Sequence, residues 1–181
     1  MQRMPRFEKK TMPEIRDLHA SSKSPLEGRV HLLVHNIRSL HNVGSIFRTA
    51  DCFGITDLIL SGYTPYPPDP KLSKTALGAD ETVSWRRCED PVDLLKDLKQ
   101  QHVRICALEQ TWNSTPLQDF TPPVQPVCLV IGNEVSGIDP QLLSLCDVSL
   151  EIPQFGTKHS FNVSVATGIV LYALFQKWTP M

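Results

Sequence analysis

The 181-residue sequence has no apolar run long enough to cross a lipid bilayer, which takes roughly 20 residues. Its longest run lies near Gly168 to Phe175, and no apolar segment follows the charged N-terminus as a secretory signal would require. None of the five cysteines forms a Cys-x-x-Cys pair, so we expect neither a disulfide nor a metal site. These absences predict a cytoplasmic protein that keeps its thiols reduced and needs no membrane.

Neither sign of charge dominates, because 18 Lys and Arg stand against 19 Asp and Glu. This balance argues against a protein that coats nucleic acid nonspecifically, since such coating needs many phosphate contacts. Basic residues do gather in an N-terminal arm, residues 1–28, and Trp85 directly precedes Arg86 and Arg87. The arm is either a solvated, partly disordered segment or a basic recognition element. Its basic residues include Arg3, Arg6, Lys9, Lys10, Arg16 and Lys23.

Apolar, strand-like runs alternate with helical segments over the rest of the chain. Strands are expected near residues 29–34, 57–60, 82–85, 103–108, 127–131 and 148–152, and helices near 42–53, 91–101, 140–145 and 164–177. This alternation predicts an α/β fold, with a mostly parallel sheet and helices on both faces, in one domain over residues 29–181. Asn42 and Asp139 are expected N-caps, Gly54 is an expected helix stop, and the proline-rich stretch 63–70 is expected to be a loop.

Three polar loops follow predicted strands, at the sheet edge where open α/β sheets bind ligands. They are marked by Asn36, Asn42, Gly44 and Arg48 in the first, by Gly132, Asn133, Glu134 and Gly137 in the second, and by Gly156, Ser160 and Asn162 in the third. Arg48 falls on the side of its helix that faces away from the apolar stripe. Ser160 and Asn162 stand where short side chains cap a helix. No loop has the spacing of a dinucleotide-binding or P-loop motif.

Together the three loops resemble the SpoU branch of the SPOUT methyltransferase superfamily, whose members methylate ribose 2′-hydroxyls of tRNA and rRNA. The residues that match its motifs are Asn36, Asn42, Gly44 and Arg48, then Gly132, Asn133, Glu134 and Gly137, then Ile152 through Ala166. Phe161 stands where the family usually has leucine. The resemblance covers about residues 30–178.

The resemblance implies a deep trefoil knot near the C-terminus, which forms a pocket for S-adenosylmethionine. The residues expected in this pocket are Leu108, Glu109, Gly132, Ile152, Ser160 and Phe161. It also implies a homodimer through the last helix. That helix, from Val165 to Phe175, is apolar around most of its circumference, which fits either a dimer interface or deep burial within one chain.

The resemblance further assigns roles in methyl transfer. Arg48 is expected to orient the nucleotide phosphate and to stabilise the developing alkoxide, since a guanidinium does not readily lose its proton. Asn42, Glu134, Ser160 and Asn162 are expected to position the ribose and Arg48. We expect tRNA as the substrate rather than rRNA, because no separate N-terminal RNA-binding domain is recognisable. The N-terminal arm and Trp85-Arg86-Arg87 are expected to recognise the RNA instead. The alternatives are an rRNA methyltransferase, a catalytically silent RNA-binding protein on the same fold, and a small-molecule methyltransferase.

Overall fold

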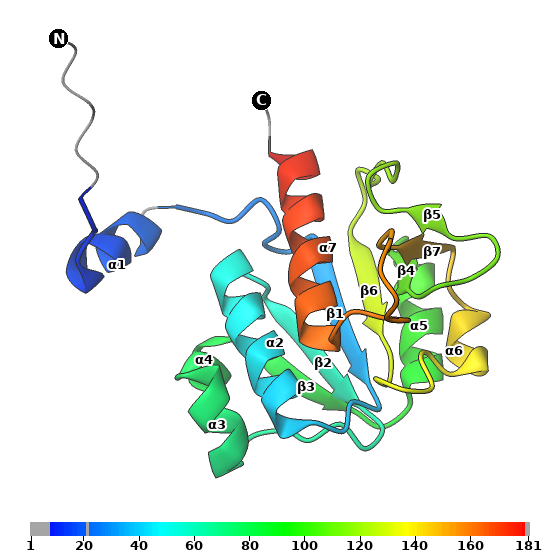
Figure 1. Cartoon of the computed structure of the whole chain (residues 1–181), viewed down its shortest axis with the longest axis horizontal. Coiled ribbons are helices and arrows are strands. Elements are labelled where there is room, and N and C mark those ends of the chain that lie inside the picture. Colours follow the sequence, from blue (N-terminus) through cyan, green and yellow to red (C-terminus); the bar gives the residue numbers. More distant parts are fainter. Residues whose placement is uncertain (1–7, 21, 180–181) are drawn as a thin grey trace, which may run out of the picture.

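The computed structural model describes residues 8–20 and 22–179, so Arg3 and Arg6 of the arm lie outside the described residues. In the described part, seven parallel strands form one sheet in the order β3-β2-β1-β6-β4-β7-β5 (Figure 1). The strands are β1 (Val30–His35), β2 (Asp57–Ser61), β3 (Trp85–Cys88), β4 (Arg104–Leu108), β5 (Thr115–Pro116), β6 (Val127–Ile131) and β7 (Val148–Glu151). The helices are α1 (Met12–Ala20), α2 (Leu40–Phe53), α3 (Pro70–Ala76), α4 (Ala79–Thr82), α5 (Pro91–Gln100), α6 (Pro140–Leu143) and α7 (Val163–Trp178).

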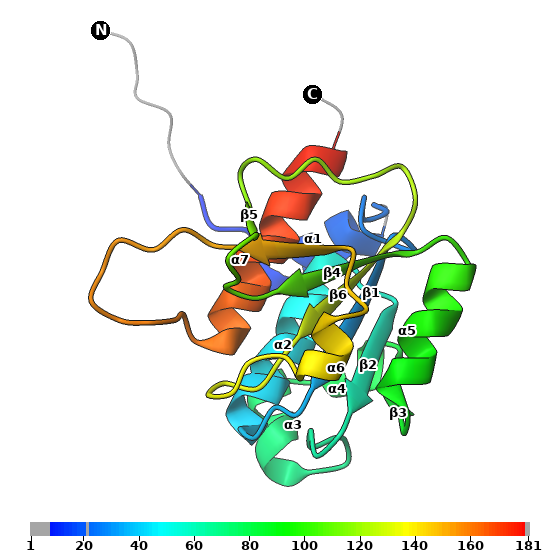
Figure 2. The same cartoon turned by 90° about the vertical axis from the view of Figure 1, so that its right-hand side faces the viewer.

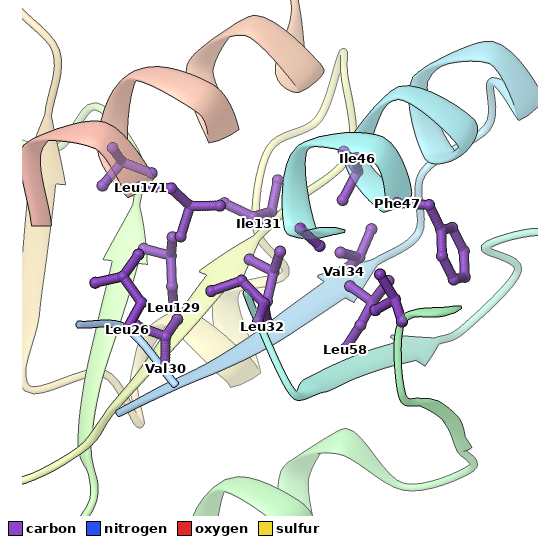
Figure 3. Close-up of a cluster of buried hydrophobic side chains, with 14 of the residues drawn as sticks. Leu26, Val30, Leu32, Val34, Ile46, Phe47, Leu58, Leu129, Ile131 and Leu171 are labelled. Carbon is purple, nitrogen blue, oxygen red and sulfur yellow. The ribbon is translucent and has the colours of Figure 1, made fainter. Parts of the chain in front are cut away.

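Helices cover both faces of the sheet, which confirms the predicted α/β fold. Figure 2 shows α2 and α7 on one side of the strands and α5 on the other. Side chains of β1 alternate between the two layers: Leu32 and Val34 pack under α2, whereas Leu33 joins the cluster under α5 and α6. Figure 3 shows the first layer, in which Phe47 of α2 and Leu171 of α7 meet the strands. Within the described residues, no helix is both long enough and apolar enough to cross a membrane.

One predicted helix cap is wrong. Helix α2 begins earlier than expected, and its N-cap is Ser39, whose side chain accepts a hydrogen bond from the backbone N–H of Asn42. Asp139 takes the predicted N-cap position of α6, but its side chain makes no capping bond, because its carboxylate accepts from His35 instead. The predicted stop at Gly54 is confirmed: the residue is left-handed, at φ 65°, and its N–H bonds back into the last turn.

The region between β2 and α5 also differs from prediction. Residues 79–82 form the short helix α4, so the strand expected at 82–85 lies later, at β3. The proline-rich stretch ends in an unpredicted helix, α3. Asp69 caps this helix by accepting from the N–H groups of Lys71 and Leu72, and Pro70 takes the first helical position.

The segment before β1 is partly structured. Met12–Ala20 forms α1, and Leu26 is fully buried in the core cluster beneath α2 and α7. The basic arm therefore reaches the domain through a residue that packs in its core. A functional division of the chain near residue 28 stays a prediction.

Candidate active site

The three polar loops meet at the carboxyl edge of the sheet, and Glu134 lies where they join. Its Oε1 accepts hydrogen bonds from the Asn42 side chain (2.9 Å) and from the Ser39 N–H (3.3 Å). Its Oε2 accepts from the Arg38 N–H (3.1 Å). One carboxylate from the loop after β6 thus holds the start of α2, which follows β1.

Asn42 extends this network to the third loop. Its Oδ1 accepts a hydrogen bond of 3.0 Å from the side-chain amide of Asn162. Asn162 in turn caps α7, because its Oδ1 accepts from the N–H groups of Ser164 and Val165. Asn162 therefore serves both as the predicted cap and as a member of the site, and three predicted residues form one connected chain.

The environment of Glu134 favours its charged form. Partial burial by itself would raise the pKa of Glu134, but the hydrogen bonds from the Asn42 side chain and from nearby backbone amides outweigh it. The pKa of Glu134 therefore lies below its ordinary value of 4.5. A carboxylate that holds several donors and titrates this low is suited to orient its neighbours rather than to remove a proton near pH 7.

A cavity of about 270 Å³ opens beside this network, between the ends of β4, β6 and β7. Apolar side chains such as Leu108 and Leu150 line part of it, and the loop after β6 contributes its backbone. The wall includes all six residues predicted for a cofactor pocket, namely Leu108, Glu109, Gly132, Ile152, Ser160 and Phe161. Its only other basic or acidic lining residues are Glu134, Glu151 and His159.

Close backbone approach shapes this wall. A Cβ on Gly132 would lie 2.5 Å from the carbonyl carbon of Gly137 and 2.5 Å from the backbone nitrogen of Ile138, so only glycine fits. Gly137 has a φ of 71° and passes close to Glu109, whose Oε2 accepts from the N–H of Ile138. Glu109 thus fixes the loop as well as lining the cavity.

Two predicted residues make no such contact. Ser160 lines the cavity with an exposed side chain and has no hydrogen bond to the described residues, so its hydroxyl is available. Arg48 is exposed on α2, as predicted, and does not line the cavity. Asn42, Glu134 and Asn162 are therefore brought together, Ser160 lines the same cavity as Glu134, and Arg48 makes no hydrogen bond to any of them.

Behind the loops lies a layer of polar residues in which His35 and Ser61 were not predicted from the sequence. His35 is 6% exposed, and its ring nitrogens lie 2.8 Å from Ser61 Oγ and 2.9 Å from Asp139 Oδ2. Asn36, left-handed at φ 57°, donates to the same Asp139 carboxylate. Asn133 donates to the Asn36 carbonyl at 2.8 Å, which ties the first loop to the second. The only signal in the sequence was polar residues at the ends of apolar strands.

The described residues contain no cluster of three or more His, Cys, Asp or Glu placed to hold a metal ion. His31 and His35 are four residues apart, but each is paired with a carboxylate. His31 Nδ1 lies 2.6 Å from Asp57, and His35 bonds Asp139.

Fold and site define a class: a parallel α/β protein whose cavity is built by three loops at the carboxyl edge of the sheet. A model of the SpoU rRNA Methylase family matches residues 29–172. The chain therefore belongs to this family, and the resemblance inferred from its motifs is confirmed.

Individual relatives include enzymes with two kinds of RNA substrate. The chain is 34% identical to a tRNA (guanosine(18)-2′-O)-methyltransferase of Aquifex aeolicus over 140 residues, which are 76% of this chain and 64% of the relative. It is 32% identical to the 23S rRNA (guanosine-2′-O-)-methyltransferase RlmB of Neisseria meningitidis over 140 residues, 77% of this chain and 55% of the relative. The chain thus spans about three fifths of these relatives' length.

A solved structure supplies a liganded comparison. The SpoU methyltransferase AviRb from Streptomyces viridochromogenes, in complex with the cofactor AdoMet, superposes with a TM-score of 0.75 at 26% identity. The match covers 83% of this chain and 61% of that one. It supports the fold described above and shows that a protein with this fold binds S-adenosylmethionine.

Proposed function

We propose that this protein is an S-adenosylmethionine-dependent RNA methyltransferase that modifies a ribose 2′-hydroxyl. The observation that carries the proposal is a cavity lined by Glu134, which is linked through Asn42 to Asn162, in a chain of the SpoU family. The cavity offers a place for a methyl donor, and the network lies at its wall, where a ribose can be held.

The cavity walls fit this cofactor. S-adenosylmethionine combines a flat base with a cationic sulfonium, so it needs apolar contacts, polar backbone groups and little positive charge. Leu108 and Ile152 supply apolar surface, and Glu109, Glu134 and Glu151 place carboxylates around the cavity. The glycine wall at Gly132 lets a ligand approach the backbone. At about 270 Å³ the cavity is near the lower end, roughly 300 Å³, of small-molecule sites.

When bound, the cofactor supplies an activated methyl group, so the protein's task is to present a weak nucleophile. Glu134 fixes Asn42, and Asn42 fixes Asn162, which holds the start of α7. The available hydroxyl of Ser160 then contacts the ribose. Arg48 binds the nucleotide phosphate and stabilises the alkoxide that develops on the 2′-oxygen.

The proposed substrate is tRNA in the cytoplasm. Relatives of similar identity act on tRNA and on rRNA, so an rRNA substrate is the alternative that experiment must separate. The five cysteines are all free thiols, which supports a reducing compartment. Mass-spectrometric nucleoside mapping of RNA from cells that lack or overproduce the protein identifies the substrate, because one 2′-O-methyl nucleotide should disappear in the former.

Arg48→Ala tests the mechanism. Arg48 is exposed and has no hydrogen bond or ion pair with the described residues, so the variant should fold normally and bind S-adenosylmethionine as the wild type does in calorimetry. Methyl transfer to RNA should fall by a factor of about 10²–10³, the typical effect of losing one stabilising donor.

Arg104→Ala is the matched control, since that arginine lies at the start of β4 and contacts the ring of Phe120. Near-normal turnover of Arg48→Ala would remove Arg48 from the mechanism. A wild-type protein that binds RNA but not S-adenosylmethionine would instead favour the silent RNA-binding protein.

A homodimer through α7 belongs to the same proposal. One side of α7 is buried within the chain by Val170, Leu171 and Leu174. The other side leaves Val165 and Tyr172 half exposed, so burial inside one chain does not cover the helix. A second copy packed on this side would cover it.

A further inference from the structure

We propose that a strip of three cations and one histidine, Arg38, Lys71, Lys74 and His41, binds phosphates of the RNA strand whose ribose enters the cavity. We call it the cationic strip. This inference rests on the proposed function and deepens it, because it names the surface that holds the RNA. It places that surface on the loop before α2 and on α2 and α3, rather than on the N-terminal arm or on Trp85-Arg86-Arg87, the two RNA contacts expected from the sequence.

The strip is connected to the cavity by described contacts. Glu134 lines the cavity and accepts a hydrogen bond from the backbone N–H of Arg38, which fixes the start of the strip. His41, in the first turn of α2, has its Nδ1 2.9 Å from Thr75 Oγ1 of α3. The strip therefore runs from the cavity wall across the start of α2 to α3.

Close packing fixes α3 in this position. A Cβ on Gly44 of α2 would lie 2.6 Å from the Leu72 carbonyl oxygen, so the two helices touch through backbone. Leu72 is fully buried between them, whereas Lys71 and Lys74 are exposed. Helix α3 thus presents its lysines to solvent from a rigid support.

The strip lacks the ion pairs that neutralise four other cations of the described chain. On α5, Lys96 bonds Asp93 at 2.8 Å and Lys99 bonds Asp147 at 2.7 Å. No described carboxylate pairs with a member of the strip. The paired cations of the other surfaces are Arg86 with Asp57, Arg87 with Glu89, and the two lysines of α5.

The cations next to Trp85 are used within the protein. Arg86 is held by Asp57, and Arg87 lies over the ring of Tyr66, 4.9 Å from its centroid. Trp85 packs edge-on against Phe47. These contacts leave the three residues less suited to RNA than the sequence suggested.

The carboxylates nearest to the strip already have donors. Glu134 is held by backbone N–H groups and Asn42, Asp69 caps α3 through the N–H groups of Lys71 and Leu72, and Asp80 accepts from Ser73. All of these donors are neutral, and none of the three carboxylates forms an ion pair with a described residue of the strip. Unpaired, exposed positive charges beside a nucleotide site fit a phosphate backbone, which needs charge rather than an apolar surface.

Charge reversal on α3 tests the inference. Lys71→Glu/Lys74→Glu should bind fluorescein-labelled bulk tRNA about tenfold more weakly in fluorescence anisotropy, and the slope of log affinity against log salt should fall by about 2, one for each lost lysine. S-adenosylmethionine binding and thermal unfolding should not change. Lys96→Glu/Lys99→Glu on α5 carries the same charge change on the other face of the sheet and should leave RNA binding near the wild-type value.

Several results would overturn the inference. One is an unchanged salt slope in the α3 variant; another is an equal loss in the α5 variant, which would reflect net charge alone. Loss of cofactor binding in the α3 variant would show a structural role for the lysines. Competition by polyglutamate as strong as that by tRNA would point to an acidic protein as the partner. If the wild-type protein binds tRNA through the strip yet never methylates RNA, the proposed methyltransferase function is wrong, whereas the proposal that the strip binds RNA is still supported.

Discussion

Gly132 directly follows β6, and its backbone packs against the backbone of the loop that it begins. Because the atoms a Cβ would meet belong to the backbone of Gly137 and Ile138, they cannot move aside as a side chain can. We expect Gly132→Ala to destabilise the fold by about 1–3 kcal/mol and to weaken S-adenosylmethionine binding, since this backbone lines the cavity. Urea unfolding and calorimetry measure the two effects.

Gly156→Ala is the control for this substitution. Gly156 lies between β7 and α7, and a Cβ there would meet nothing within 4 Å. Equal stability of the two variants would show that the close approach at Gly132 is not needed.

Glu134 makes the stability of the site depend on pH. Its pKa is lowered in the folded protein, so its contribution is fully present above the ordinary value of 4.5 and is lost as the pH falls through the lower folded-state pKa. Glu134→Gln should therefore be less stable than wild type at pH 7, and the difference should shrink below about pH 4.5. Denaturant unfolding of both proteins from pH 7 to pH 3 measures it. A difference that stays constant with pH would mean that ionisation of Glu134 contributes nothing.

At the scale of whole helices, two glycines have opposite roles. Gly44 is where α2 touches the backbone of α3, whereas a Cβ on Gly168 of α7 would meet only the Thr49 methyl at 3.9 Å. Gly44→Ala should push the helices apart and destabilise the protein, and it should also weaken RNA binding by displacing α3.

Gly168→Ala should instead stabilise the protein by about 0.5–1 kcal/mol, because glycine is unfavourable within a helix. Thermal unfolding compares the two, and equal effects would contradict the packing described.

Long elements could be predicted from the sequence because their apolar patterns repeat. Helices α2, α5 and α7 appear close to where expected. Helix α3 was missed because seven residues after a proline-rich stretch show too little periodicity. The side chains of Asn42 and Asp139 are suited to capping, but they bind tertiary partners 92 and 104 residues away, so neither makes the expected capping bond, although Asp139 does stand at the N-cap position of α6.

The site was predictable where its residues stand at the ends of parallel strands, since those ends meet at one edge. Asn42, Glu134 and Asn162 converge for this reason. The pairing of His35 with Ser61 and Asp139 could not be predicted, because nothing local shows which distant residues a buried histidine will meet. The cationic strip could not be predicted either, because the presence or absence of ion pairs depends on side-chain positions that a sequence does not give.

At the scale of the whole molecule, strand order explains where the site forms. Strand β6 lies between β1 and β4, and β7 lies beyond β4. The loops after β1 and β6 therefore start on neighbouring strands, and the cavity opens between the ends of β4, β6 and β7. Figure 2 shows the segment from β7 to α7 as a long excursion that returns to the sheet at α7. The trefoil knot implied by the family concerns this segment and stays a prediction.

The same segment connects the cavity to the proposed dimer interface. Ile152 lines the cavity and also a shallow groove beside α7, with Pro153, Ile169 and Ala173. A second copy packed on α7 would therefore press on the backbone that forms the cavity wall. We infer that dimer formation and cofactor binding support each other through residues 152–153.

Val165→Asp/Tyr172→Asp tests this coupling. Both side chains are about half exposed on α7, at 50% and 52%, so the variant should fold but should sediment as a monomer where wild type sediments as a dimer. It should also bind S-adenosylmethionine more weakly in calorimetry. Leu77→Asp changes a leucine that is 67% exposed at the C-terminal end of α3, which packs on α2 and α4, and should leave both properties unchanged. A monomeric wild type would contradict the interface, and a monomeric variant with full cofactor affinity would contradict the coupling.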